Sequence, residues 1–156
     1  MDRMPDLKYP RQPPPPVYLL LTLIVMGALH AFVPIARLVP PPYQYGGIAL
    51  IVLGFAVCVP SARLFQKLGT PLKPFEESTV VVTTGMFRFT RNPMYLGMVA
   101  GLLGVAILLG SLVAFLPVPV FGAIIHVRFI VHEERFMEEL FGAEYLAYKR
   151  KVRRWI

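Results

Sequence analysis

The sequence predicts an all-α integral membrane protein with about four transmembrane helices, a cytoplasmic loop and a C-terminal amphipathic helix. Of its 156 residues, 56% are hydrophobic and only 16% are charged, and the mean hydropathy is +0.60. A soluble domain of this length is too small to bury so large an apolar fraction, and a disordered chain would be poor in apolar residues. Lipid must therefore cover much of the apolar surface. A single cysteine excludes a disulfide framework.

The first half of the chain predicts two N-terminal transmembrane helices within residues 17–65. A polar leader at residues 1–16 ends in four consecutive prolines, and such a run favours an extended, non-helical conformation. We expect the first span at residues 17–38, where further prolines follow, and the second at residues 46–65. Pro60 is expected to kink the second span near its end.

The second half begins with a polar loop at residues 66–93, which is far longer than a turn. Nearly forty apolar residues follow at 94–131, roughly twice the length that one bilayer crossing needs. We therefore expect this stretch to break near residues 110–117 into a third and a fourth span. An amphipathic segment follows at 132–148, and the Lys- and Arg-rich end at 149–156 suits anionic lipid headgroups.

The positions of the charges orient these spans. Of the 16 Lys and Arg residues, three lie in the leader, five in the loop and its flanks and seven in the tail, so only Arg37 falls on the opposite side. The positive-inside rule places the side with 15 cations, and with it both termini, in the cytoplasm, as in a multi-pass protein of the bacterial inner membrane. Topology thus accounts for the net charge of +7 without a nucleic-acid partner.

Polar residues gather where the last two predicted spans meet the cytoplasm. Pro93 is suited to a helix start, where free backbone N–H groups favour an anionic ligand, and Arg88 and Arg91 lie just before it. Near the end of the fourth span, Arg128 and Glu133 are about 140° apart around a helix, so Arg128 needs another partner or a ligand. The alternative is structural: arginines that contact headgroups and a solvated helix face.

Metal chemistry is not expected. His126 and His132 lie about 240° apart around a helix, so they do not form a two-histidine metal face. Residues 132–136 carry Phe where the zinc-protease motif requires its second His. No phosphate-binding P-loop occurs in the sequence.

The polar segments together resemble a known family. The segment TGMFRFTRNPMYLG at residues 84–97 resembles the Arg-His-Pro-x-Tyr-x-Gly signature of isoprenylcysteine carboxyl methyltransferases and their phospholipid methyltransferase relatives. The two glutamates and the FGAEYLAY motif within residues 133–148 resemble the rest of their catalytic region, and VRRW at 152–155 resembles the ending of small bacterial members. The resemblance marks residues 66–156 as a methyltransferase-like catalytic region.

This resemblance implies S-adenosylmethionine as methyl donor, bound in a cytoplasmic pocket that the C-terminal tail closes. It also implies a lipophilic acceptor that enters from the bilayer: an isoprenylcysteine carboxylate, another membrane lipid or a small thiol. The implied catalytic residues are Arg128 and Glu133. The implied cofactor site consists of Arg91, Asn92, Tyr95, Leu96, Gly97, Glu133, Glu134, Tyr145 and Tyr148. Because Asn92 replaces the His of the signature and cannot titrate near neutral pH, we expect it to orient the cofactor.

Elementary chemistry agrees with this interpretation. The donor carries an ammonium, a carboxylate and a sulfonium, which need carboxylates, N–H donors and aromatic faces. Two alternatives remain open. One is a non-catalytic membrane protein of the same fold. The other is a nicotinamide-dependent reductase, because membrane sterol reductases resemble this family in their C-terminal helices, although the sequence lacks a dinucleotide-binding fingerprint.

Overall fold

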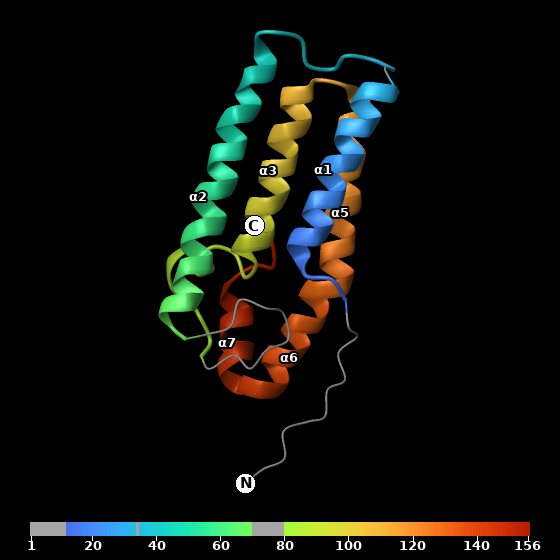
Figure 1. Ribbon diagram of the computed structural model, residues 1–156. Coiled ribbons are helices and arrows are strands. Elements are labelled where there is room, and N and C mark those ends of the chain that lie inside the picture. The colour runs from blue at the N-terminus through green and yellow to red at the C-terminus, as the bar shows by residue number, and fades with distance from the viewer. Residues whose placement is uncertain (1–11, 34, 70–79) are drawn as a thin grey trace.

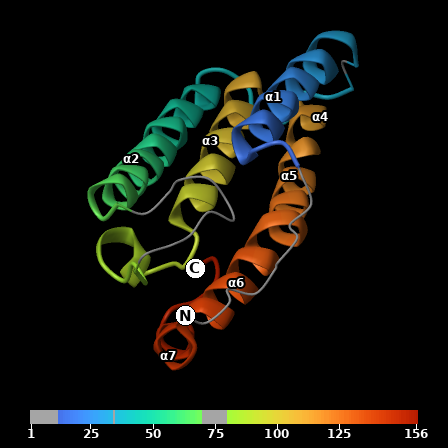
Figure 2. The ribbon, with the colours of Figure 1, turned by 60° about the horizontal axis from the view of Figure 1, so that its bottom comes forward.

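The computed structural model describes residues 12–33, 35–69 and 80–156, and it is built from helices. Four helical segments lie side by side in a bundle (Figures 1 and 2). They are α1 (Pro15–Phe32), α2 (Gly46–Lys67), α3 (Pro93–Leu109) and a fourth run formed by α4 (Leu112–Phe115) and α5 (Pro117–Ile125). The prediction of an all-α membrane protein is confirmed.

The fourth run continues beyond the bundle. A π-helix, η3 (His126–Ile130), joins α5 to α6 (Val131–Phe141), and α7 (Ala143–Lys151) follows after a turn. Gly142 makes this turn with φ +51°, a conformation that glycine adopts without strain. In Figure 1, α6 leans away from the axis of α5, and α7 lies below α3 with the C-terminus near the lower end of α3. The segment predicted as one amphipathic tail, residues 132–148, is therefore two helices.

Within the described residues, three segments are long and apolar enough to cross a membrane: Pro15–Phe32, Tyr43–Lys67 and Leu112–Phe141. The predicted second span at 46–65 lies within α2, which includes Pro60. The counterpart of the predicted third span is α3, whose 17 residues are at the short end of the range for a bilayer crossing. The count of four spans stays a prediction.

The first helix corrects two sequence predictions. The expectation that all four prolines at residues 13–16 stay extended is wrong for the last two, because α1 begins at Pro15. Proline is tolerated in the first helical turn, where its missing N–H would have no intrahelical partner. The helix also ends at Phe32, before the predicted boundary at 38. Leu38 lies outside the helix, and its backbone N–H donates to the carbonyl of Gly110 at 2.7 Å. Residues 1–11 of the predicted leader lie outside the described residues.

The break between the third and fourth helices is narrower than predicted. Gly110 ends α3 with φ +71°, which favours glycine, and a Cβ at this position would lie 2.5 Å from the carbonyl oxygen of Val39. The chain is helical again from Leu112, and Leu116 keeps helical dihedral angles before Pro117. The break within the predicted interval 110–117 therefore takes only two residues.

Backbone-to-backbone packing holds α3 against α2. A Cβ built on Gly54 would lie 2.6 Å from the carbonyl oxygen of Gly97, and one on Gly104 would lie 2.6 Å from that of Gly47. Small residues at such a crossing allow two helices to approach closely. On the other side of α3, the core between α1, α3 and the fourth run includes the fully buried side chains Met26, Leu102, Phe121, Ile125, Phe129 and Ile130. Helix α3 is thus packed on two sides.

Candidate functional site

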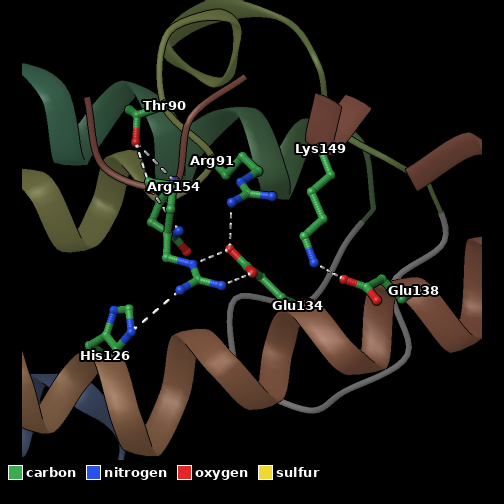
Figure 3. A network of polar contacts seen from close by, with 8 residues as sticks. Thr90, Arg91, His126, Glu134, Glu138, Lys149 and Arg154 are labelled. Carbon is green, nitrogen blue, oxygen red and sulfur yellow. Dashed lines mark hydrogen bonds and ion pairs between the residues drawn. The ribbon is translucent and has the colours of Figure 1, made fainter. Parts of the chain in front are cut away.

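Three segments that are distant in the sequence meet at the end of the bundle that is lower in Figure 1: the loop before α3, helix α6 and the chain after α7 (Figures 1 and 3). The loop contains a 3-10 turn, η2 (Gly85–Arg88), and pairs with the C-terminal segment in a parallel bridge. The N–H of Arg91 donates to the carbonyl of Arg153 at 3.0 Å. The side-chain amide of Asn92 and the hydroxyl of Thr90 donate to the carbonyl of Arg154, at 3.0 and 3.2 Å.

Glu134 is the centre of the ion-pair network in Figure 3, and its side chain is only 5% exposed. Its two oxygens accept hydrogen bonds from Nε and Nη2 of Arg154 at 3.0 and 2.7 Å, and Nη2 of Arg91 lies 3.3 Å away. A buried carboxylate needs such partners because burial without them is costly. The hydrogen bonds to Glu134 in turn raise the pKa of Arg154. Arg154 therefore stays positively charged.

The guanidinium group of Arg91 has donors that Glu134 does not use. Its side chain is 9% exposed, and only Nη2 faces Glu134. Nε and Nη1 are buried and have no hydrogen-bond partner in the part of the chain that the structure describes. Buried guanidinium donors without an acceptor are unfavourable, and a carboxylate is their preferred partner. Arg91 is therefore suited to hold an anionic group of a ligand.

A second carboxylate is fixed beside Glu134. The hydroxyl of Tyr95, on α3, donates to Oε1 of Glu133 at 2.6 Å. The tyrosine is buried, and its ring centroid lies 6.4 Å from that of Phe129. Glu133 and Glu134 are neighbours in the first turn of α6, and each is held by a partner from α3 or from the loop before it.

Two buried tyrosines lie next to each other on α7. The ring centroids of Tyr145 and Tyr148 are 5.9 Å apart, and the hydroxyl of Tyr148 donates to the carbonyl of Phe87 at 2.7 Å. Burial raises the pKa of Tyr148 to about 12 and the pKa of Tyr145 further, so both rings are neutral near pH 7. Arg91 and Glu134 are close enough to Tyr145 to affect its pKa. Neutral aromatic faces attract cations.

The remaining predicted site residues lie apart from this network. Gly97 faces α2, where a Cβ would lie 2.6 Å from Gly54. Leu96 is half-buried, and its N–H donates to the carbonyl of Asn92 at 3.0 Å. Arg128 is exposed in the π-helix, and its carbonyl accepts a hydrogen bond from Gln12. The structure thus pairs Arg91 with Glu134 and Tyr95 with Glu133, and it gives Gly97 a packing position.

Sequence reasoning missed Arg154 and its neighbours, because it assigned residues 149–156 to the lipid surface. Nη1 of Arg154 lies 3.4 Å from Nε2 of His126, whose ring stacks on Trp155 at a centroid distance of 6.4 Å. The one signal in the sequence was the resemblance of residues 152–155 to the ending of small bacterial relatives. That the tail closes a cofactor pocket stays a prediction.

Comparison with known proteins identifies the family. A family model described as phospholipid methyltransferase matches residues 43–144, which are 102 of the 156 residues and include α2, α3 and α6. An uncharacterized protein of Haemophilus influenzae is 43% identical over 63 residues, covering 40% of this chain and 100% of that protein. The family suggests a membrane methyltransferase-type function. This chain belongs to the phospholipid methyltransferase family.

Proposed function

We propose that this protein is an S-adenosylmethionine-dependent membrane methyltransferase that acts on a lipophilic acceptor. Family membership supports the methyltransferase class. One observation supports S-adenosylmethionine as the cofactor. Two buried guanidinium donors of Arg91 have no partner among the described residues, and they adjoin the carboxylate of Glu134.

The residues of the network match the charged groups of the donor. The donor carboxylate would accept hydrogen bonds from Nε and Nη1 of Arg91. Its ammonium group would interact with Glu133 and Glu134, and the rings of Tyr145 and Tyr148 offer faces to a sulfonium. When bound, S-adenosylmethionine supplies an electrophilic methyl group.

The contribution of the protein is to orient the two reactants. Tyr95 holds Glu133 by its hydrogen bond of 2.6 Å, and the tail holds Glu134 through Arg154. Alignment of a nucleophile with a methyl group supplies several kcal/mol of the barrier. We propose that Arg128 is the cation that faces the methyl acceptor. Its side chain is exposed on the π-helix, and such irregular turns occur frequently at functional sites.

We further propose that the end of the bundle that carries the network faces the cytoplasm. We also propose that the partners of the protein are membrane lipids and the methyl acceptor. The positive-inside rule supports this orientation. Among the described residues, Arg37 lies at the opposite end of the bundle, where its backbone forms an antiparallel bridge with that of Ser111. The other described cations belong to the network end: Arg63, Lys67, Arg88, Arg91, Arg128, Arg135, Lys149, Arg150, Lys151, Arg153 and Arg154.

Calorimetry with S-adenosylhomocysteine in detergent tests the cofactor assignment. We expect saturable binding that Arg91→Met weakens by at least roughly 10- to 100-fold, the loss expected from one of its two hydrogen bonds to a charged group. Arg88→Met is the matched control, because Arg88 is exposed in the 3-10 turn before the site. Glu133→Ala and Glu134→Ala should also weaken binding while the protein stays folded.

Transfer of a labelled methyl group from S-adenosylmethionine to a membrane lipid extract then identifies the acceptor. Absence of saturable binding by the wild-type protein would favour the non-catalytic alternative.

A further inference from the structure

The loop before α3 and the chain around the end of α7 run side by side in the same direction. The hydroxyl of Tyr148 donates to the carbonyl of Phe87 at 2.7 Å, and the N–H of Arg91 donates to the carbonyl of Arg153 at 3.0 Å. A parallel bridge joins the backbones of the two segments between these contacts and α3. The exposed side chains of the two segments therefore belong to one part of the molecular surface.

The two segments divide their cations between the interior and the surface. The ion-pair network of Figure 3 includes one arginine from each segment. Arg88 and Arg153, by contrast, are exposed and form no ion pair among the described residues. Phe89, next to Arg88, is 70% exposed. Since residues 80–92 and 145–156 contain no acidic residue, neither segment offsets this positive charge.

Helix α7 adds a third cation to this surface. Tyr148 faces the loop, and Lys151 is exposed about 60° from it around the helix. Arg150 is exposed about 160° from Tyr148, on the opposite side of α7. We define the loop–tail surface as Arg88, Phe89, Lys151 and Arg153.

The residues that follow the loop–tail surface place it at the edge of the apolar part of the bundle. Trp155, two residues after Arg153, lines the same recess as Val99 of α3 and Val118 of α5. Val99 lies about 9 Å along the helix from the start of α3, and Val118 belongs to the candidate span Leu112–Phe141. Tryptophan is enriched where a membrane meets water. The cations just before it are therefore at the level of lipid headgroups.

We propose that the loop–tail surface binds the headgroups of anionic phospholipids. Guanidinium groups bind phosphate through charge-assisted hydrogen bonds, and an anionic leaflet attracts basic residues beside the membrane. An exposed aromatic ring among these cations suits the same interface. The proposal specifies the charge of a lipid partner and does not depend on methyl transfer.

Native mass spectrometry of the full-length protein in detergent tests this proposal. The probes are phosphatidylglycerol and phosphatidylcholine with the same acyl chains, added in equal amounts. We expect the wild type to bind phosphatidylglycerol preferentially. Each basic residue near an anionic surface contributes roughly a five-fold change in affinity, so Arg88→Gln/Arg153→Gln should lower this preference roughly 5- to 25-fold. Arg135→Gln/Arg150→Gln is the matched control, because it removes two exposed arginines outside the loop–tail surface.

The thermal midpoint verifies that each variant is folded, and Arg88→Gln alone replaces the double variant if that one does not fold. Phe89→Ser keeps every charge and should weaken the binding of both lipids without changing the preference.

Equal binding of the two lipids by the wild type would overturn the proposal. So would an equal loss of preference in the two double variants, because the diffuse positive charge of this end would then bind the lipid. Displacement of phosphatidylglycerol by an equal concentration of glycerol phosphate would also overturn it, because the surface would then be a site for a soluble phosphate ester. A wild type that binds phosphatidylglycerol but not S-adenosylhomocysteine would refute the proposed function alone.

Discussion

Replacing Arg154 with Met should release the C-terminal segment from Glu134. Methionine keeps much of the length of the side chain and removes the guanidinium group, so both hydrogen bonds to Glu134, at 3.0 and 2.7 Å, are lost. Glu134 still has Arg91 at 3.3 Å and is not left without a cation. The backbone hydrogen bonds of the tail to the loop before α3 are also retained.

The geometry sets the expected magnitude. A hydrogen bond to a charged group contributes roughly 1.5–3 kcal/mol when it is buried. The side chain of Arg154 is 34% exposed, so solvent screening reduces the contribution of each bond. We therefore expect a loss of about 2 kcal/mol for the two bonds together, which is roughly a 30-fold change in the ratio of docked to undocked tail.

Cleavage by a lysine-specific protease measures this ratio. Cutting after Lys151 requires the tail to undock, and the rate follows the population of the open form when opening is fast relative to cleavage. We expect Arg154→Met to be cut roughly 30-fold faster than the wild type. Arg153→Met is the matched control, because the Arg153 side chain is exposed and only its backbone carbonyl binds the loop. Equal rates in the two variants would refute the assigned role of the Arg154–Glu134 pair.

Three further predictions concern packing, a tyrosine and the acceptor side. Gly97→Ala should lower the thermal midpoint in detergent, because its Cβ would meet a backbone carbonyl of α2 at 2.6 Å and overpacking costs about 1–3 kcal/mol. Gly101→Ala, with nothing within 4 Å, should leave the midpoint unchanged. Tyr148→Phe should destabilise the protein by about 1–3 kcal/mol, because the buried carbonyl of Phe87 loses its donor. Since burial raises the pKa of Tyr148 to about 12, the neutral phenol stabilises the wild type below about pH 10 and loses this effect as the pH rises toward 12. The difference in thermal midpoint between wild type and variant should therefore shrink over that interval. Arg128→Ala should lower methyl transfer and leave the calorimetric affinity for S-adenosylhomocysteine unchanged, and a loss confined to cofactor affinity would contradict its acceptor-side role.

Local properties of the chain predicted most of the helices. Apolar run length alone placed the second span within α2, and Gly110 falls in the predicted break because only a residue tolerant of positive φ ends a helix in this way. The errors occurred where local signals are weak. Proline marks the edge of a helix without deciding on which side of it the helix begins, so Pro15 was assigned to the leader.

The apolar share and the long apolar runs predicted an α-helical membrane protein, because both are properties of the chain before it folds. The resemblance also selected Arg91, Glu133 and Glu134 before any distance was known. Only the tertiary structure assigned partners to these groups. Glu134 and Arg154 are 20 positions apart, and they meet because the chain reverses at Gly142 and α7 returns the tail to the start of α3. Ion pairing depends on distance in space, which no spacing along the chain specifies once the chain reverses direction.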